Sequence, residues 1–124
     1  MRGMVTFLHE LVTQFLNQIN TITVYISEAH SLEEWPIGSK EFGHYRQPQS
    51  LEERKEAAAD FIRIFNYKLP LVIDSLENEF EKHYAPWPIR FYIVHHQKLK
   101  YIAEPVEGSF TLSKIVEVLR ECLQ

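Results

Sequence analysis

Apolar and polar positions alternate along the chain in blocks that predict four helices and four strands. In residues 4–19 the apolar side chains follow the spacing of one helix face, which predicts an amphipathic helix. Residues 22–26 and 71–73 are short, rich in β-branched side chains and apolar on both faces, as is typical of strands inside a covered sheet. Residues 89–95 and 99–103, joined by a tight polar turn, predict an antiparallel hairpin.

Helix-start patterns complete the order of elements. Ser50 and Glu53 form a capping-box pattern, in which each side chain can bond the other's exposed backbone N–H. Asp74 is predicted to N-cap a short helix that ends near residue 84, and residues 112–122 carry an apolar face. The order helix, strand, helix, strand, helix, strand, strand, helix predicts an α/β fold with a mixed sheet covered by helices on both faces.

Length, charge and cysteine count narrow the class of protein. A chain of 124 residues predicts a single domain, 1–124. The chain has a net charge of -4 and shows no cluster of lysines and arginines of the kind that binds phosphates. We therefore expect no nucleic-acid partner. No apolar run approaches the roughly 20 residues that span a bilayer, and we expect a cytoplasmic protein with no membrane segment in this chain. The lone cysteine, Cys122, excludes an intrachain disulfide and fits a reducing compartment.

The stretch VYISEAHSLEEW, residues 24–35, places a carboxylate and an imidazole at the end of a predicted buried strand. If the backbone stays extended, residues two apart point to the same side, so Glu28 and His30 can lie together at the carboxyl end of the strand. Covered parallel sheets bind ligands at that end. From spacing alone, the simpler alternative is that Glu28 caps a loop and His30 is an ordinary surface histidine.

The other histidines give weaker patterns. His95 and His96 are adjacent on a predicted strand and should face opposite sides, which is unfavourable for a shared metal ion. Glu28, His30 and His44 could in principle hold a metal, but His44 belongs to the long loop predicted between the first strand and the second helix. We therefore predict no metal site.

Three aromatic residues, Tyr25, Trp35 and Trp87, could form a wall for a ring-shaped ligand. Core packing explains Tyr25 and Trp87 equally well. Arg54 is interpreted as structural, with a partner near the start of its helix.

Four stretches of the chain resemble the iodothyronine deiodinases and their microbial deiodinase-like relatives. They are VYISEAHSLEEW, QSLEERKEAAADF, PLVIDSLENEF and YAPWPIRFYIV, which occur in the family's order across most of residues 4–103. The resemblance implies a thioredoxin-like fold with a peroxiredoxin-style added strand. It also implies reductive deiodination, in which a selenocysteine or cysteine attacks iodine and an external thiol is the reductant.

The resemblance also assigns roles to individual residues. It assigns Glu28 and His30 catalytic roles in proton delivery and substrate contact. It assigns Arg90 to binding the carboxylate of a thyronine. Tyr25 and Trp35 are the remaining predicted substrate contacts. The small aromatic or thiol-reactive substrate and the thiol reductant are the partners that the resemblance implies, and a homodimer is left open.

The family's nucleophile has no matching position in this chain. In the family a strand before the first helix ends in a loop of the type G-S-C-T-(Sec or Cys)-P-P-F, and Met1 begins just after the point where that loop would end. The positive end of a helix dipole favours the reactive anion there. Cys122 lies at the opposite end of the chain, so it cannot substitute. We expect a truncated chain that lacks the first, central strand, with its nucleophile encoded upstream of Met1, for example behind a UGA selenocysteine codon taken as a stop.

Departures from the family pattern leave the substrate open. Glu33 and Glu34 replace the Asp-Gly before the tryptophan, and Pro48 replaces a histidine of the vertebrate enzymes, so thyroid hormone metabolism is not implied outright. Two classes of function remain. One is a deiodinase-like oxidoreductase, with a peroxiredoxin-like thiol reductase as a variant; the other is a catalytically silent thioredoxin-like binding module.

Overall fold

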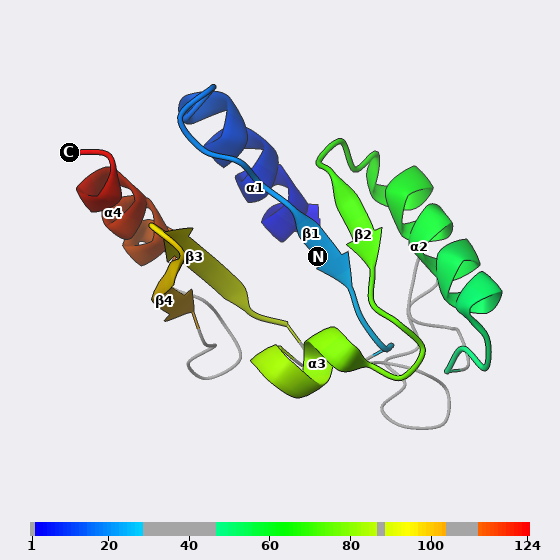
Figure 1. Cartoon of the computed structure of the whole chain (residues 1–124). Coiled ribbons are helices and arrows are strands. Elements are labelled where there is room, and N and C mark those ends of the chain that lie inside the picture. The colour runs from blue at the N-terminus through cyan, green and yellow to red at the C-terminus, as the bar shows by residue number, and fades with distance from the viewer. Residues whose placement is uncertain (1, 29–46, 87–88, 104–111) are drawn as a thin grey trace. The chain divides into compact units, whose positions relative to one another are not determined.

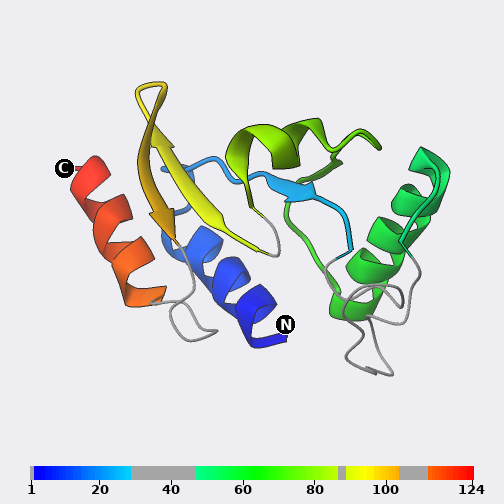
Figure 2. The same cartoon turned by 90° about the horizontal axis from the view of Figure 1, so that it is seen from below.

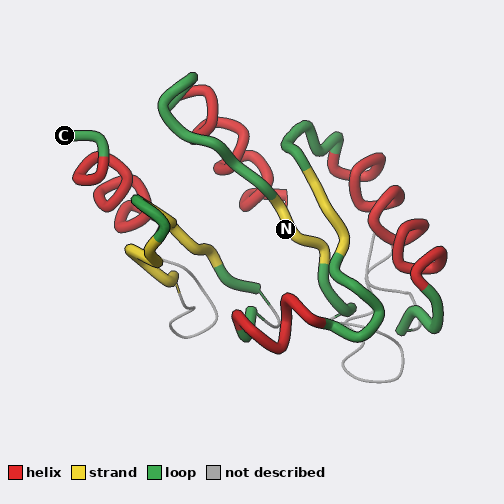
Figure 3. Tube along the Cα trace, viewed as in Figure 1, coloured by secondary structure: helices red, strands yellow, loops and turns green. Residues whose placement is uncertain are grey.

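A computed structural model describes residues 2–28, 47–86, 89–103 and 112–124 of the chain. The helices are α1 (Arg2–Gln14), α2 (Leu51–Phe65), α3 (Glu79–Tyr84) and α4 (Leu112–Cys122), and the strands are β1 (Thr23–Tyr25), β2 (Leu71–Ile73), β3 (Phe91–His95) and β4 (Lys98–Ala103). The elements follow the predicted order, so the structure is mixed α/β (Figures 1 and 3). It divides into two compact units, unit 1 (Met1–Trp87) and unit 2 (Pro88–Gln124), and the single-domain assignment stays a prediction.

Unit 1 contains a two-stranded parallel sheet. Thr23 of β1 pairs with Leu71 of β2, and Tyr25 pairs with Ile73. Helix α2 forms the crossover between the strands and lies along β2 (Figure 1), as parallel pairing requires a long connection. Val72, on the opposite face from Leu71, is 46% exposed.

The core of unit 1 lies on the face of the sheet that carries Thr23 and Tyr25. One buried cluster in it consists of Val5 of α1, Phe61 of α2 and Tyr67. The residues that pack against them are Tyr25, Phe65, Leu69 and Leu71. The ring of Phe61 lies 5.0 Å from that of Phe65 and 5.2 Å from that of Tyr67, which is within the range of favourable aromatic pairs. Both long helices therefore share one apolar cluster with β1.

Tyr67 ties this cluster to the polar groups around it. Its hydroxyl lies 2.5 Å from Thr23 Oγ1, and its ring lies 5.6 Å from that of His9. Lys68 N donates to His9 Nε2 at 3.1 Å, so the segment after α2 is bonded to α1 as well as to β1. Burial raises the pKa of the Tyr67 phenol above its usual value, because it disfavours the phenolate, and the hydrogen bond with Thr23 partly offsets this effect.

Helix α1 is shorter than predicted. It begins at Arg2 and ends at Gln14 instead of near residue 19. Asn17 takes a left-handed conformation (φ 65°), which asparagine tolerates better than most residues and which turns the chain out of the helix. The apolar spacing continued beyond the helix because Phe15 is still buried in the turn.

The start of α2 confirms the predicted cap. Glu53 N donates to Ser50 Oγ at 3.2 Å. The return bond runs from Gln49 N to Glu53 Oε2 at 2.6 Å, one residue earlier than in the usual capping box. Helix α2 is thus bonded to the residues that precede it.

The predicted N-cap of α3 is wrong in position. Asn78, and not Asp74, precedes the helix, with a left-handed backbone (φ 60°) and no side-chain cap bond. Asp74 lies four residues before Asn78 in the chain. Its carboxylate accepts hydrogen bonds from Phe80 N at 2.9 Å and from Glu81 N at 3.1 Å, in the first turn of the helix. It therefore satisfies N–H groups that the first turn leaves without helical partners.

Unit 2 is an antiparallel hairpin with a helix along it. Phe91 pairs with Ala103 and His95 with Lys98, and the register shifts between Ile93 and Val94. Helix α4 lies beside the hairpin and contacts β4 (Figure 2). Among the residues described in this unit, the buried apolar ones are Ile93, Ala103, Ile115, Val118 and Leu119.

The histidine pair at the hairpin turn differs from the prediction. His96 and Gln97 both have positive φ (51° and 64°), as a two-residue primed turn requires, so His96 is not on the strand. The two imidazole rings do not face opposite sides: their centroids are 3.9 Å apart. The expected opposite orientation was wrong because His96 belongs to the turn that follows the predicted strand 89–95. The described residues contain no group of three or more metal-ligating side chains.

Among the helices that the structure describes, none combines the length and apolarity that crossing a bilayer requires. The cytoplasmic location stays a prediction.

Candidate functional site

Two buried carboxylates follow the two parallel strands of unit 1. Glu28 lies three residues beyond the end of β1, and Asp74 directly follows β2; they are 7% and 5% exposed. Asp74 N donates to Tyr25 O at 2.9 Å, which extends the pairing of the strands to their ends. Because parallel strands end at the same edge, the carboxyl edge of this sheet carries polar side chains where α/β proteins bind ligands.

Tyr25 holds the carboxylate of Glu28. The Tyr25 hydroxyl donates to Glu28 Oε1 at 2.5 Å. The ring of Tyr25 packs edge-on against Phe61, with centroids 5.9 Å apart. Tyr25 is thus anchored in the core while its hydroxyl fixes a side chain at the sheet edge.

The backbone of Glu28 is held by a second residue, Gln47. Glu28 N donates to Gln47 Oε1 at 2.9 Å, and Gln47 Nε2 donates to Glu28 O at 3.0 Å. One side-chain amide therefore pairs with both backbone groups of Glu28, as a neighbouring strand would.

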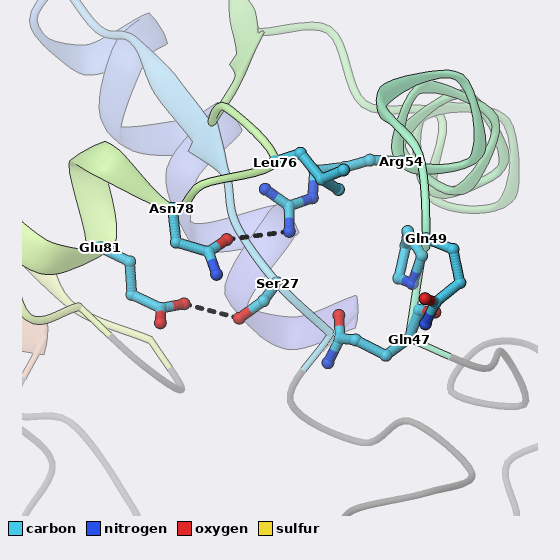
Figure 4. Close-up of a pocket in the computed structure, with 8 residues that line it drawn as sticks. Ser27, Gln47, Gln49, Arg54, Leu76, Asn78 and Glu81 are labelled. Carbon is cyan, nitrogen blue, oxygen red and sulfur yellow. Dashed lines mark hydrogen bonds between the residues drawn. The ribbon is translucent and has the colours of Figure 1, made fainter.

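A polar hollow of about 390 Å³ opens beside this edge (Figure 4). The residues that line it are Ser27, Gln47, Pro48, Gln49, Arg54, Leu76, Asn78 and Glu81. On one wall Ser27 Oγ donates to Glu81 Oε1 at 2.6 Å, which joins the end of β1 to α3. The hollow is lined by amides, a hydroxyl, a carboxylate and a guanidinium, so it suits polar groups better than apolar ones.

Arg54 forms the inner wall of the hollow and is 2% exposed. Its Nη1 donates to Asp74 O at 3.2 Å and to Ser75 O at 2.6 Å, and its Nη2 donates to Asn78 Oδ1 at 2.9 Å. Its Nε has no hydrogen-bond partner among the described residues. These contacts support a structural role, but the partners lie in the connection between β2 and α3 and not at the start of α2.

Sequence reasoning missed the burial of Arg54, although a pattern was present. Arg54 stands three, four and seven residues before Ala57, Ala58 and Phe61, which are the buried face of α2. A charged residue on an apolar helix stripe must find hydrogen-bond partners inside the protein. The contacts of Gln47 had no comparable pattern, because they join residues 19 apart in the chain.

The predicted site residues are only partly placed. Tyr25 and Glu28 are brought together, whereas His30 and Trp35, like His44 and Trp87, lie outside the described residues. Arg90 lies in unit 2 just before β3, where its Nη1 donates to Ile89 O at 2.8 Å. Its contact with a substrate carboxylate stays a prediction.

Comparison with known proteins identifies the family. The fold and the sheet edge define an α/β protein with a polar site at the ends of its parallel strands. A family model described as iodothyronine deiodinase matches residues 2–123, so the chain belongs to the iodothyronine deiodinase family.

Curated relatives agree with this assignment. The chain is 28% identical over 113 residues to a type I iodothyronine deiodinase of Xenopus laevis, a match that covers 91% of the chain and 44% of that protein. It is 34% identical over 98 residues to a type II iodothyronine deiodinase of Fundulus heteroclitus, with 75% of the chain and 36% of that protein covered. The matches therefore span less than half the length of either relative.

Proposed function

We propose that this chain forms the acid-bearing part of a deiodinase-like oxidoreductase that removes iodine reductively from iodothyronine-like aromatic substrates. The observation that carries the proposal is the buried carboxyl of Glu28, held by the Tyr25 hydroxyl at the carboxyl edge of the parallel sheet. Membership of the deiodinase family supports the reaction class.

A thioredoxin-like arrangement of the whole domain is part of this proposal. The parallel pair of β1 and β2, followed by α3, the β3–β4 hairpin and α4, supports it. In such a fold the carboxyl ends of the parallel strands lie where the substrate binds.

The proposed reaction separates an attack on iodine from a proton transfer. A thiolate or selenolate attacks the iodine atom, the carbon–iodine bond breaks, and its electron pair stays on the ring carbon. That carbon takes a proton, which we assign to Glu28 acting with His30. An external thiol then displaces iodide from the chalcogen, and a second thiol restores the nucleophile, so two thiols become one disulfide. The products are the deiodinated aromatic, iodide and a proton.

The nucleophile is proposed to lie outside residues 1–124. The only cysteine in them is Cys122, the last residue of α4. The carboxyl end of a helix carries partial negative charge, which disfavours a thiolate. Glu28, held by Tyr25 and acting with His30, would then supply the proton to a reaction that a selenocysteine or cysteine begins.

A fusion protein tests whether residues 1–124 supply the proton donor while the nucleophile comes from outside them. In it, residues 1–124 replace the matched segment of the Xenopus laevis relative, which contributes the rest of its sequence. With an iodothyronine and dithiothreitol, the fusion protein should release iodide and residues 1–124 alone should not. Cys122→Ser should leave the rate of the fusion protein unchanged. Iodide release by residues 1–124 alone that disappears in Cys122→Ser would refute the proposal.

A further inference from the structure

We infer that Gln47 is a positioning residue that fixes Glu28 at the sheet edge through its backbone. Two hydrogen bonds carry the inference, Glu28 N to Gln47 Oε1 at 2.9 Å and Gln47 Nε2 to Glu28 O at 3.0 Å. The consequence for proton transfer rests on the proposed function, whereas the backbone contact itself does not.

Gln47 is itself tied to the start of α2. Gln49 Nε2 donates to Gln47 O at 3.3 Å, and Gln49 N donates to Glu53 Oε2 at 2.6 Å. Between them Pro48 is buried, and its ring restricts the backbone. The capped helix therefore holds Gln47 in place, and Gln47 holds the backbone of Glu28.

Glu28 is thereby fixed from two directions. Gln47 sets its backbone from the α2 side, and Tyr25 sets its carboxylate from the core of unit 1. Position and direction of a carboxyl group both matter for proton transfer, because a donor must lie within hydrogen-bond reach of the atom that it protonates. Loss of Gln47 should leave the hydrogen bond from Tyr25 but free the backbone that supports it.

The chemistry of the contact requires a primary amide of this length. Gln47 uses its oxygen as an acceptor and its nitrogen as a donor towards one residue. Glutamate can replace the acceptor but not the donor, and methionine has nearly the same length with neither. The series Gln47→Glu and Gln47→Met therefore separates the two bonds from the bulk of the side chain.

Amide hydrogen exchange on the 124-residue chain tests the contact directly. In Gln47→Met the Glu28 N–H should exchange at least about tenfold faster, the change expected when one hydrogen bond is lost. Gln47→Glu should keep most of the protection, because it keeps the acceptor. Gln18→Met is the matched control, since it makes the same change at an exposed glutamine in the turn after α1, and it should leave this N–H protected. Unchanged exchange of Glu28 N–H in Gln47→Met would overturn the inference.

A measurement on the unsubstituted chain covers the case in which a variant fails to fold. The Nε2 protons of Gln47 should show a nuclear Overhauser contact to the backbone of Glu28, and the absence of that contact would overturn the inference. In the fusion protein, Gln47→Met should lower kcat, and the control Gln18→Met should not. If exchange confirms the contact while kcat does not change, the positioning role in catalysis is wrong, and the proton-donor role of Glu28 is then judged from Glu28→Gln alone.

Discussion

Replacing Glu28 by glutamine should lower the rate of reductive deiodination by about 10²- to 10⁴-fold, the range typical of a lost general acid. Glutamine keeps the shape of the side chain and can accept the hydrogen bond that Tyr25 donates at 2.5 Å. Its amide cannot deliver a proton at neutral pH. Initial rates of iodide release by the fusion protein measure the effect, and kcat and kcat/KM should fall together because proton transfer stabilises only the transition state.

The controls for this prediction separate chemistry from stability. Glu56→Gln removes an exposed carboxylate from α2 and should leave the rate unchanged. Tyr25→Phe should give a smaller loss than Glu28→Gln, because the acid stays but its support is removed. His30 lies outside the described residues, and His30→Ala should also lower the rate by about 10²- to 10⁴-fold. Equal rates for Glu28→Gln and Glu56→Gln would show that Glu28 is not the proton donor and only caps a loop.

Replacing Arg54 by methionine should lower the free energy of unfolding by about 3 to 5 kcal/mol, because three buried or partly buried oxygens lose their donors. Those acceptors are Asp74 O, Ser75 O and Asn78 Oδ1. Methionine retains most of the apolar stem, so the loss reports the guanidinium contacts more than the packing. A domain of this size has about 5 to 15 kcal/mol of net stability, which makes the effect large. Urea unfolding followed by circular dichroism measures it.

Arg63→Met is the matched control for Arg54. Arg63 lies on the same helix, its side chain is 71% exposed, and it pairs with Asp60 at 3.3 Å. Exposed pairs of this kind contribute little, so Arg63→Met should change stability by less than about 1 kcal/mol. A loss in Arg54→Met no greater than that in Arg63→Met would show that the buried contacts do not hold β2 and α3 against α2.

The sequence predicted the order of elements well, because each is set by local patterns. The capping pair Ser50 and Glu53 and the apolar strand Leu71–Ile73 depend on neighbours within a few residues, and both are found at the predicted positions. The prediction that the strand is covered on both faces was wrong, since Val72 is 46% exposed. Boundaries were less certain where one side chain changes the backbone. Asn17 follows the early end of α1, with a left-handed conformation that periodicity does not encode.

The candidate site was predictable only where the chain itself places a residue. Glu28 was expected at the carboxyl end of a strand, and it lies at the sheet edge beyond β1. The partners that fix this edge come from elsewhere in the sequence: Gln47 is 19 residues from Glu28, and Arg54 is 20 to 24 residues from its acceptors. Such contacts depend on how the helices and strands pack, so no spacing along the chain reveals them.

Deiodination in D₂O tests the central claim most directly. If an aromatic carbon gives up iodine reductively and is then protonated, the fusion protein should release one iodide for each deiodinated product. Mass spectrometry should find one deuterium on the carbon that held the iodine. Iodide release that yields a hydroxylated aromatic, or a deiodinated product without deuterium, would contradict the reductive mechanism and the proton-donor role of Glu28.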